Sequence, residues 1–172
     1  MTAGGFSKAT VAQIVARDEG RCSRCGHPVQ ADSRGLSWSI HHRRPRGMGG
    51  SRNPVVASAS NGVIACGSGT TGCHGWIESN RDEARLMGWL VPQWRDPADV
   101  PVRHWFHGWS WCTPTSWVPL TQAELWLQAG QWLADELRLN QIEDEDIEGV
   151  TRLSRAAADL FGVMAADVRR TA

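Results

Sequence analysis

The spacing of apolar and polar residues divides the first ninety residues of this 172-residue chain into a few short elements. Apolar residues at helical spacing predict a short helix over residues 8–19. Alternating apolar and polar residues predict a strand over residues 36–41, and a short apolar run predicts a second strand over residues 62–66. Residues 73–87 are expected to form a helix that Gly88 closes. This order of strand, strand and helix is a ββα unit.

The segments around this unit have a different composition. Residues 43–60 are rich in Arg, Gly, Pro, Ser and Asn and predict a long loop, which in a compact domain is usually functional or disordered. Residues 1–7 are small and polar and are expected to form a loose tail. Residues 89–120 contain six tryptophans and five prolines, which predicts short strands or extended segments wrapped over the domain. The tryptophans are expected to pack in the core, and a base-stacking surface is the alternative.

The C-terminal part of the chain is helical in pattern. Residues 121–139 predict an amphipathic helix with Thr121 as its N-cap. The acidic run over residues 143–146 indicates a solvated linker or a helix start. Residues 153–170 have the pattern of two helices joined by a tight turn at Gly162. That pattern fits a helix-turn-helix motif and a plain helical hairpin equally well.

The sequence therefore predicts an α+β domain over residues 1–120 and a helical appendage over residues 121–172. The formal net charge of zero hides a gradient along the chain. Residues 1–60 contain nine Lys/Arg and three Asp/Glu, a net charge of +6, whereas residues 121–172 contain five and ten, a net charge of −5. A basic segment is expected to meet phosphate, although the two ends could merely balance each other.

The compartment affects how the cysteines are interpreted. No run of eighteen apolar residues predicts a membrane span, and the N-terminus lacks the pattern of a signal peptide. We therefore expect a cytoplasmic protein without membrane contact. In that compartment disulfides are rare, and paired cysteines more often bind metal.

Four of the five cysteines are spaced as a structural zinc site, because zinc is bound by pairs of thiolates a few residues apart. These are Cys22, Cys25, Cys66 and Cys73. Gly26 follows the first pair and permits a tight turn, and three glycines in the longer spacer of the second pair are expected to let it fold back. Two alternatives stay open: the second pair could be ordinary buried thiols, and His27 could compete as a ligand. Cys112 has no close partner in the sequence and is expected to be a plain thiol.

The residues around these cysteines carry a second pattern. The chain reads Ile-His-His-Arg-Arg-Pro-Arg-Gly-Met-Gly-Gly from Ile40, then has Asn61, then reads Cys-His-Gly-Trp-Ile-Glu from Cys73. This order of histidine, asparagine and histidine, within a doubled cysteine frame, resembles the HNH endonuclease family. The sequence looks most like the HNH proteins of actinobacterial phages. The resemblance covers roughly residues 10–90.

The resemblance implies a zinc-stapled ββα-metal fold and metal-dependent hydrolysis of DNA phosphodiesters. It makes His41 a ligand of the catalytic metal, His42 the general base and His74 a further metal ligand. Asn61 is expected to pin the long loop through backbone hydrogen bonds, so that the base stays aimed at water. Glu78 lies one helical turn after His74, where colicin nucleases have a histidine. It is either a substitute ligand or a solvated helix residue.

The implied cofactors are structural Zn²⁺ and a catalytic divalent ion, either Mg²⁺, Mn²⁺ or another transition ion. The implied partner is DNA, with Arg43, Arg44 and Arg46 expected to contact phosphates. The phage resemblance further implies a role in genome packaging beside the terminase large subunit and the portal. The alternatives are a non-catalytic zinc-containing DNA-binding regulator, a homing nuclease, an RNA-cutting nuclease and a toxin.

Overall fold

The computed structural model describes residues 5–47 and 50–142 as continuous segments. Beyond them it describes residues 146, 148, 149, 151, 152 and 155. The chain divides into two compact units, Met1–Pro119 and Leu120–Ala172. The hairpin predicted around Gly162 lies outside the described residues, as does most of the acidic run 143–146.

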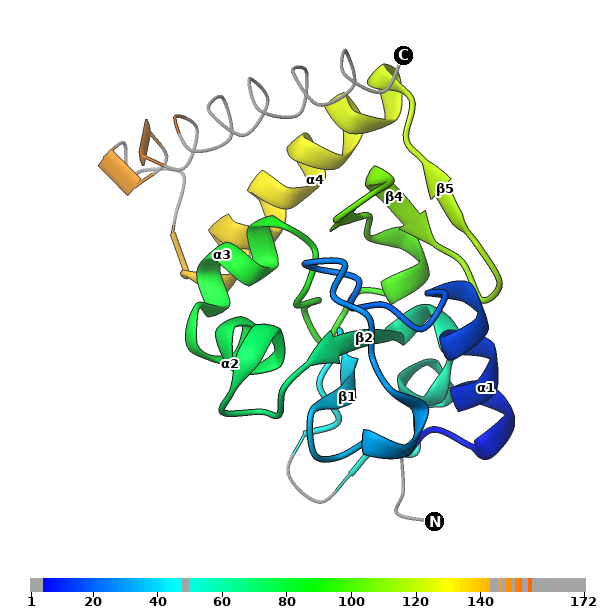
Figure 1. Ribbon diagram of the computed structural model, residues 1–172. Coiled ribbons are helices and arrows are strands. Elements are labelled where there is room, and N and C mark those ends of the chain that lie inside the picture. The colour runs from blue at the N-terminus through cyan, green and yellow to red at the C-terminus, as the bar shows by residue number, and fades with distance from the viewer. Residues whose placement is uncertain are drawn as a thin grey trace. The chain divides into compact units, whose positions relative to one another are not determined.

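A two-stranded antiparallel sheet lies at the centre of the first unit. Strand β1 (Trp38–His42) pairs with strand β2 (Gly62–Cys66) along its whole length. Helix α1 (Lys8–Arg17) packs against β2, and helix α2 (Gly72–Ser79) packs against both strands. The two helices lie on opposite sides of the sheet (Figure 1). The predicted first helix and both predicted strands are confirmed, and the unit is of mixed α+β class.

The helix predicted over residues 73–87 is divided in two, so that prediction was wrong at one position. Helix α2 ends before Asn80, and helix α3 (Arg81–Leu86) begins directly after it. The side-chain amide and the backbone N–H of Asn80 both donate to the Trp76 carbonyl at 2.9 Å, which satisfies the end of α2 and breaks the helix. The predicted closing residue, Gly88, has φ +72° and follows α3.

Alternation along the strands sends side chains into two separate clusters. One cluster lies on the side of α1 and contains Ile14, Trp38, Ile40, Ala59 and Ile64. The other contains Val63, Ile77, Ala84, Trp89, Leu90, Val102, Cys112 and Trp117. By the same alternation His41 faces α2, where it meets Glu78, while His42 faces the first cluster and stacks on Phe6. The two histidines thus point to opposite faces of β1.

The N-terminal segment before α1 takes part in the fold. Phe6 packs against the cluster on the α1 side of the sheet. The Ser7 hydroxyl caps α1 by accepting the Thr10 N–H at 3.0 Å. The predicted loose tail is therefore wrong for residues 5–7, because one aromatic side chain and one helix cap fix this segment.

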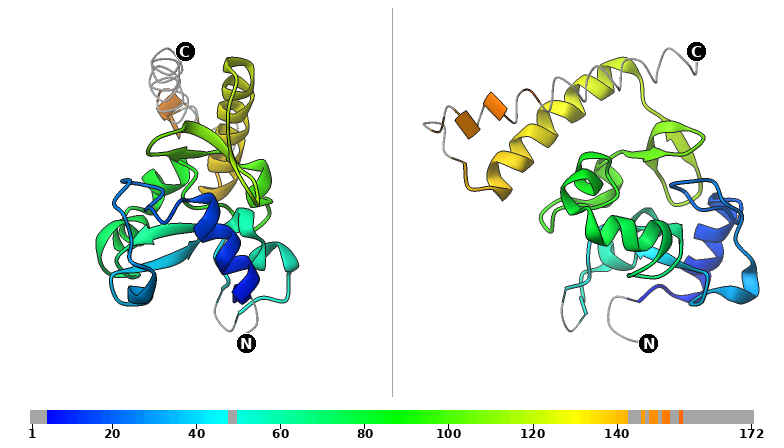
Figure 2. Two further views of the ribbon diagram at one scale, coloured as in Figure 1. Left: turned by 45° about the vertical axis from the view of Figure 1, so that its right-hand side comes forward. Right: turned by 60° about the vertical axis from the view of Figure 1, so that its left-hand side comes forward.

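The tryptophan-rich segment forms a second small sheet. Its strands are β3 (Val102–His104), β4 (Gly108–Cys112) and β5 (Trp117–Pro119), in the order β3-β4-β5 and antiparallel throughout. This segment is coloured green to yellow-green in Figure 2. Three of its six tryptophans are buried, namely Trp89, Trp109 and Trp117. For these three, packing is the observed use of the indole rings.

Short 3-10 helices occupy parts of the connecting loops. They are η1 (Ala31–Ser33), η2 (Pro54–Ala57), η3 (Ala59–Asn61) and η4 (Pro97–Asp99). Two of them lie at the end of the predicted long loop over residues 43–60, next to β2. The loop therefore ends in a defined conformation before the strand begins.

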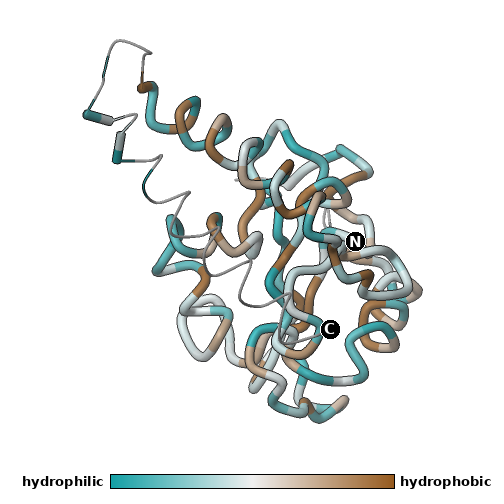
Figure 3. The backbone as a smooth tube through the Cα atoms, turned by 90° about the horizontal axis from the view of Figure 1, so that it is seen from above, coloured by the Kyte–Doolittle hydropathy of each residue, from teal (hydrophilic) through white to brown (hydrophobic). Residues whose placement is uncertain are grey.

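In the second unit, helix α4 (Gln122–Leu139) is confirmed as predicted, with Thr121 as its N-cap. The Thr121 hydroxyl accepts the Glu124 N–H at 3.3 Å, and the Glu124 carboxylate accepts the Thr121 N–H at 2.7 Å. This reciprocal capping box fixes the start of the helix. Hydrophobic and hydrophilic residues alternate along it (Figure 3). Among the described residues, no helix has the length and apolar character needed to cross a membrane.

Candidate metal centres and the pocket beside them

Four cysteine sulfurs lie together where β2 ends and α2 begins. They belong to Cys22, Cys25, Cys66 and Cys73, all free thiols, and all four sulfur atoms lie within 4.8 Å of one another. The Sγ atoms of Cys25 and Cys66 are 3.8 Å apart. Four thiols gathered without a disulfide could hold a structural metal such as zinc. The predicted pairing of the two cysteine pairs is confirmed, and neither His27 nor Cys112 belongs to this cluster.

Glycines make the two cysteine-bearing turns possible. Gly26 has φ +74°, and its N–H donates to the Cys22 carbonyl at 2.7 Å, which closes the first turn. Gly72 has φ +59°, and a Cβ added there would lie 2.6 Å from the Cys66 carbonyl oxygen. The six-residue spacer therefore folds back tightly enough to bring Cys73 beside Cys66.

The surroundings of the cysteine cluster are suited to a charged metal–thiolate group. The Arg24 guanidinium lies 3.6 Å from the Cys73 sulfur and 3.6 Å from the centre of the Trp76 ring. Its positive charge would offset part of the net charge of four thiolates around a divalent ion. Burial raises the pKa of the Cys22 thiol and raises the pKa of Cys73 to about 11. Metal binding here would therefore release protons.

A second cluster brings together three of the predicted metal ligands, His41 from β1 and His74 and Glu78 from α2. Their ligand atoms lie within 4.8 Å of one another. Glu78 Oε1 is 3.7 Å from His41 Nδ1 and 3.9 Å from His74 Nε2, so one carboxylate oxygen faces both rings. The other oxygen, Oε2, accepts a hydrogen bond from Arg81 at 3.1 Å. This geometry favours Glu78 as a ligand over Glu78 as a solvated helix residue.

The hydrogen bonds of the two imidazoles show which nitrogens face the cluster. His41 Nε2 lies 2.9 Å from the Trp89 carbonyl oxygen, which can only accept, so Nε2 carries the hydrogen and Nδ1 presents a lone pair to Glu78. His74 Nδ1 lies 2.6 Å from the Ser39 hydroxyl, which leaves its Nε2 directed at the same carboxylate. Burial lowers the pKa of His41 to about 3 and also lowers the pKa of His74.

These neutral rings and the carboxylate form an electron-rich set. Nδ1 of His41 and Oε1 of Glu78 face each other at 3.7 Å, and neither atom carries a hydrogen when the ring is neutral and the carboxyl ionised. A cation between these two atoms, or a water that donates to both, would relieve their repulsion. Two imidazole nitrogens and one carboxylate oxygen are a donor set that suits a divalent metal ion.

A pocket of about 810 Å³ opens beside this cluster. It is lined by Gly5, Phe6, Arg34, Gly35, Ser39, Ile40, His41, His42, Pro45, Arg46, Gly47, His74 and Glu78. The His42 ring stacks on Phe6, with ring centroids 4.0 Å apart and an interplanar angle of 15°. His41 and His42 both line the pocket although they point to opposite faces of β1, so the pocket extends to both sides of this strand.

Asn61 makes the loop contacts that were predicted for it. It is fully buried, and its Oδ1 accepts the backbone N–H of Arg44 at 2.6 Å. Its Nδ2 donates to the Arg44 carbonyl at 3.1 Å and to the Val56 carbonyl at 2.9 Å. One side chain thereby joins two distant points of the loop over residues 43–60. Asn61 therefore holds the backbone of the loop that follows His42.

Arg43 is fully buried, and the prediction that it contacts phosphate is wrong. Its guanidinium donates to five backbone carbonyls. These are Gly88 at 2.9 Å, Ser60 at 3.4 Å, Pro97 at 3.0 Å, Val100 at 2.5 Å and Pro101 at 3.4 Å. Arg44 is half-buried and donates to the Arg95 carbonyl at 3.2 Å. Of the three predicted phosphate-binding arginines, only Arg46 is both exposed and part of the pocket wall.

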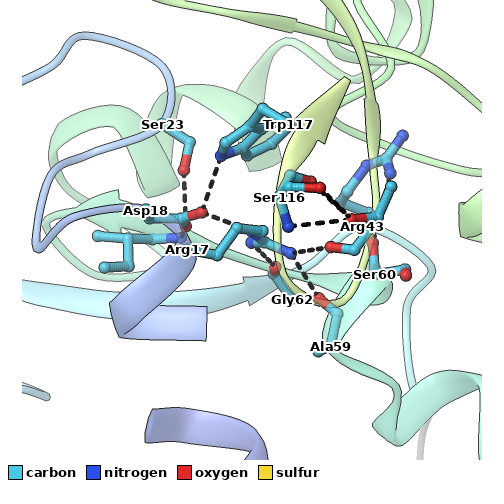
Figure 4. A network of polar contacts seen from close by, with 11 residues as sticks. Arg17, Asp18, Ser23, Arg43, Ala59, Ser60, Gly62, Ser116 and Trp117 are labelled. Atoms are coloured by element: carbon cyan, nitrogen blue, oxygen red, sulfur yellow. Dashed lines mark hydrogen bonds and ion pairs between the residues drawn. The ribbon is translucent and has the colours of Figure 1, made fainter. Parts of the chain in front are cut away.

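A buried ion pair joins the cysteine turn to β2 (Figure 4). Arg17 Nε donates to Asp18 at 2.7 Å, and Arg17 Nη2 donates to the Gly62 carbonyl at 2.6 Å. The second oxygen of Asp18 accepts from the Ser23 hydroxyl and from the Ile64 N–H, both at 2.9 Å. The turn between Cys22 and Cys25 is therefore tied to the strand that carries Cys66.

The sequence did not single out four residues that matter here: Phe6, Asp18, Arg34 and Ser39. A local signal existed for Ser39, because it lies two residues before His41 in an alternating strand and so shares its face.

Comparison of this chain with protein-family models, curated proteins and solved structures gives no match.

Proposed function

We propose that this chain is a metal-dependent endonuclease of the HNH type, which hydrolyses DNA phosphodiester bonds in a ββα-metal site. One observation carries the proposal: His41, His74 and Glu78 converge in a pocket whose wall also contains His42. A structural zinc cluster alone would fit a DNA-binding regulator equally well. The second cluster, with a further imidazole on the wall of the same pocket, favours an enzyme.

The metal-binding residues would be the three that converge. A divalent ion held by His41, His74 and Glu78 would neutralise the phosphate oxygens and stabilise the leaving oxygen. Each of these three side chains is oriented by a hydrogen-bond partner within the protein. The Trp89 carbonyl orients His41, the Ser39 hydroxyl orients His74, and Arg81 holds the far oxygen of Glu78.

His42 is the proposed general base. A neutral imidazole can accept a proton from water at neutral pH. As the proton moves to the ring, the water oxygen bonds to phosphorus and the bond from phosphorus to the 3′ oxygen breaks. The leaving oxygen then takes a proton from solvent. Stacking on Phe6 restricts the orientation of the His42 ring, which keeps the accepting nitrogen in place.

Two buried residues hold the backbone next to the base. Arg43 directly follows His42 and is fixed by its five carbonyl contacts, while Asn61 binds both backbone groups of Arg44. The chain therefore leaves β1 along a defined path. Arg46, which is exposed on the pocket wall, is the member of the arginine run that supports phosphate binding.

The direct test is cleavage of supercoiled plasmid in the presence of Mg²⁺, Mn²⁺, Co²⁺, Ni²⁺ or Zn²⁺. We expect at least one ion to support nicking or linearisation by the wild type, and Glu78→Gln to weaken that activity. Glu83→Gln is the matched control, because Glu83 is an exposed carboxylate in α3 and does not line the pocket. A wild type that cuts no DNA with any of these ions contradicts the proposal.

The choice of DNA as substrate and a place beside a phage terminase large subunit and portal are proposed from the sequence resemblance. A parallel assay on RNA of matching sequence separates the two substrates. Faster cleavage of RNA than of DNA would replace the DNA-cutting proposal with that of an RNA-cutting nuclease of the same chemistry.

A further inference from the structure

The pocket contains two cationic side chains that the metal-binding residues do not engage. Arg34 and Arg46 both line it, and both are exposed. In the part of the chain that the structure describes, neither has a hydrogen-bond or ion-pair partner for its guanidinium. Glu78 is the one carboxylate on the described pocket wall, and it faces the two histidines and Arg81. The two free guanidinium groups therefore favour an anion.

Arg34 stands on a turn that is fixed before any ligand arrives. It is the C-cap of η1, and its backbone forms an isolated bridge with Trp38, the first residue of β1. The next residue, Gly35, has φ +89° and donates its N–H to the Trp38 carbonyl at 2.7 Å. The hydroxyls of Ser33 and Ser37 lie 2.6 Å apart across the turn. A side chain on a fixed turn loses less backbone entropy on binding than one on a loose loop.

The two arginines come from segments at opposite ends of β1. Arg34 lies beside the first residue of the strand, and Arg46 lies four residues after its last residue, His42. A strand rises about 3.3 Å per residue, so the first and last residues of β1 lie about 13 Å apart along the strand. One DNA strand advances about 3.4 Å per nucleotide along the helix axis, so the length of β1 corresponds to about four nucleotides.

We infer that Arg34 binds a backbone phosphate of a polynucleotide, at the opposite end of β1 from Arg46. The site then takes an extended nucleic acid strand running along β1 in preference to a mononucleotide or a small phosphate ester. Arg34 contributes substrate affinity and register and takes no part in the chemical step. The catalytic part of this statement rests on the proposed function, whereas the binding part can be tested without cleavage.

The binding test uses zinc-loaded protein and a fluorescent 20-base-pair duplex with no added divalent ion, and affinity is measured by anisotropy over a range of salt concentrations. Arg34→Gln is expected to weaken binding and to reduce the slope of log K against log salt by about 0.9, the value for one lost phosphate contact. Arg34→Lys should keep most of that slope. Arg52→Gln is the matched control, because Arg52 is an exposed arginine that does not line the pocket.

The activity test compares the same duplex with bis(4-nitrophenyl) phosphate, a diester that carries a single phosphate. Arg34→Gln is expected to raise KM for the duplex, leave its kcat nearly unchanged and leave hydrolysis of the small ester unchanged. An equal loss on both substrates would overturn the inference, as would a salt slope equal to that of Arg52→Gln. If the wild type hydrolyses neither substrate and Arg34→Gln still lowers the salt slope, the proposed enzyme fails and the phosphate contact stands.

Discussion

Replacing Arg43 should destabilise the fold far more than replacing any exposed arginine. All five N–H groups of its guanidinium face backbone carbonyls, and three of these contacts, to Gly88, Pro97 and Val100, are 3.0 Å or shorter. A hydrogen bond to a charged group contributes about 1.5–3 kcal/mol. Counting only the three short contacts, Arg43→Met should lower the free energy of unfolding by about 4 kcal/mol or more, because the carbonyls stay buried without donors.

Arg43→Lys keeps the charge but offers three donors in place of five, without the planar geometry. We expect a loss of about 2 kcal/mol for this variant, between the wild type and Arg43→Met. Urea unfolding of the zinc-loaded proteins, followed by tryptophan fluorescence, measures both values. Arg46→Met is the control, because Arg46 is exposed, and it should change stability by less than about 0.5 kcal/mol.

The reasoning about Arg43 would be refuted by an Arg43→Met protein that loses less than about 1 kcal/mol with an unchanged m-value. Such a result would mean that the carbonyls around the guanidinium do not depend on Arg43 for their hydrogen bonds. It would also reopen phosphate binding as the role of this arginine.

Three further predictions concern the metal clusters and one buried histidine. Cys22→Ser should lose both its bound zinc and its folded structure, because metal binding and folding are coupled in so small a unit. A folded, zinc-free variant would contradict this. His74→Ala should raise the Mn²⁺ concentration needed for cleavage, and a Glu78→Ala protein with unchanged Mn²⁺ dependence would remove Glu78 from the site. Burial lowers the pKa of His104 to about 3, so the unfolded chain binds the proton first as pH falls below about 6.5. Protonation of His104 in the unfolded chain should then lower the free energy of unfolding by about 1.4 kcal/mol for each pH unit below that value. Urea unfolding between pH 6 and pH 5 should show a shallower dependence of this free energy on pH for His104→Gln than for the wild type. An equally steep dependence would contradict the lowered pKa of His104.

The sequence predicted the features that depend on local spacing. Alternation located β1 and β2, and the cysteine spacing located the four-sulfur cluster, because both patterns are set by residues close along the chain. The glycine-rich spacer before Cys73 was correctly expected to fold back. The loop contacts of Asn61 were predicted from the resemblance, and its hydrogen bonds to the backbone of Arg44 agree with that role.

The features that escaped prediction depend on partners far away in the sequence. Arg43 belongs to a run of arginines that is typical of a phosphate-binding loop, yet its acceptors lie 17 to 58 residues further along the chain. Phe6 occurs in a segment of small polar residues, and only the fold brings it against His42. The break at Asn80 results from a side-chain hydrogen bond that competes with the helix, which the apolar pattern does not reveal.

The measurement that tests the central claim most directly is single-turnover cleavage by His42→Ala, with DNA and metal binding measured on the same preparation. The account predicts a rate at least about a hundredfold below wild type, the range expected when a general base is lost. It also predicts nearly unchanged DNA affinity, because phosphate contacts supply most of that affinity, and nearly unchanged metal affinity, because His41, His74 and Glu78 remain. Cleavage by His42→Ala at the wild-type rate would contradict the account.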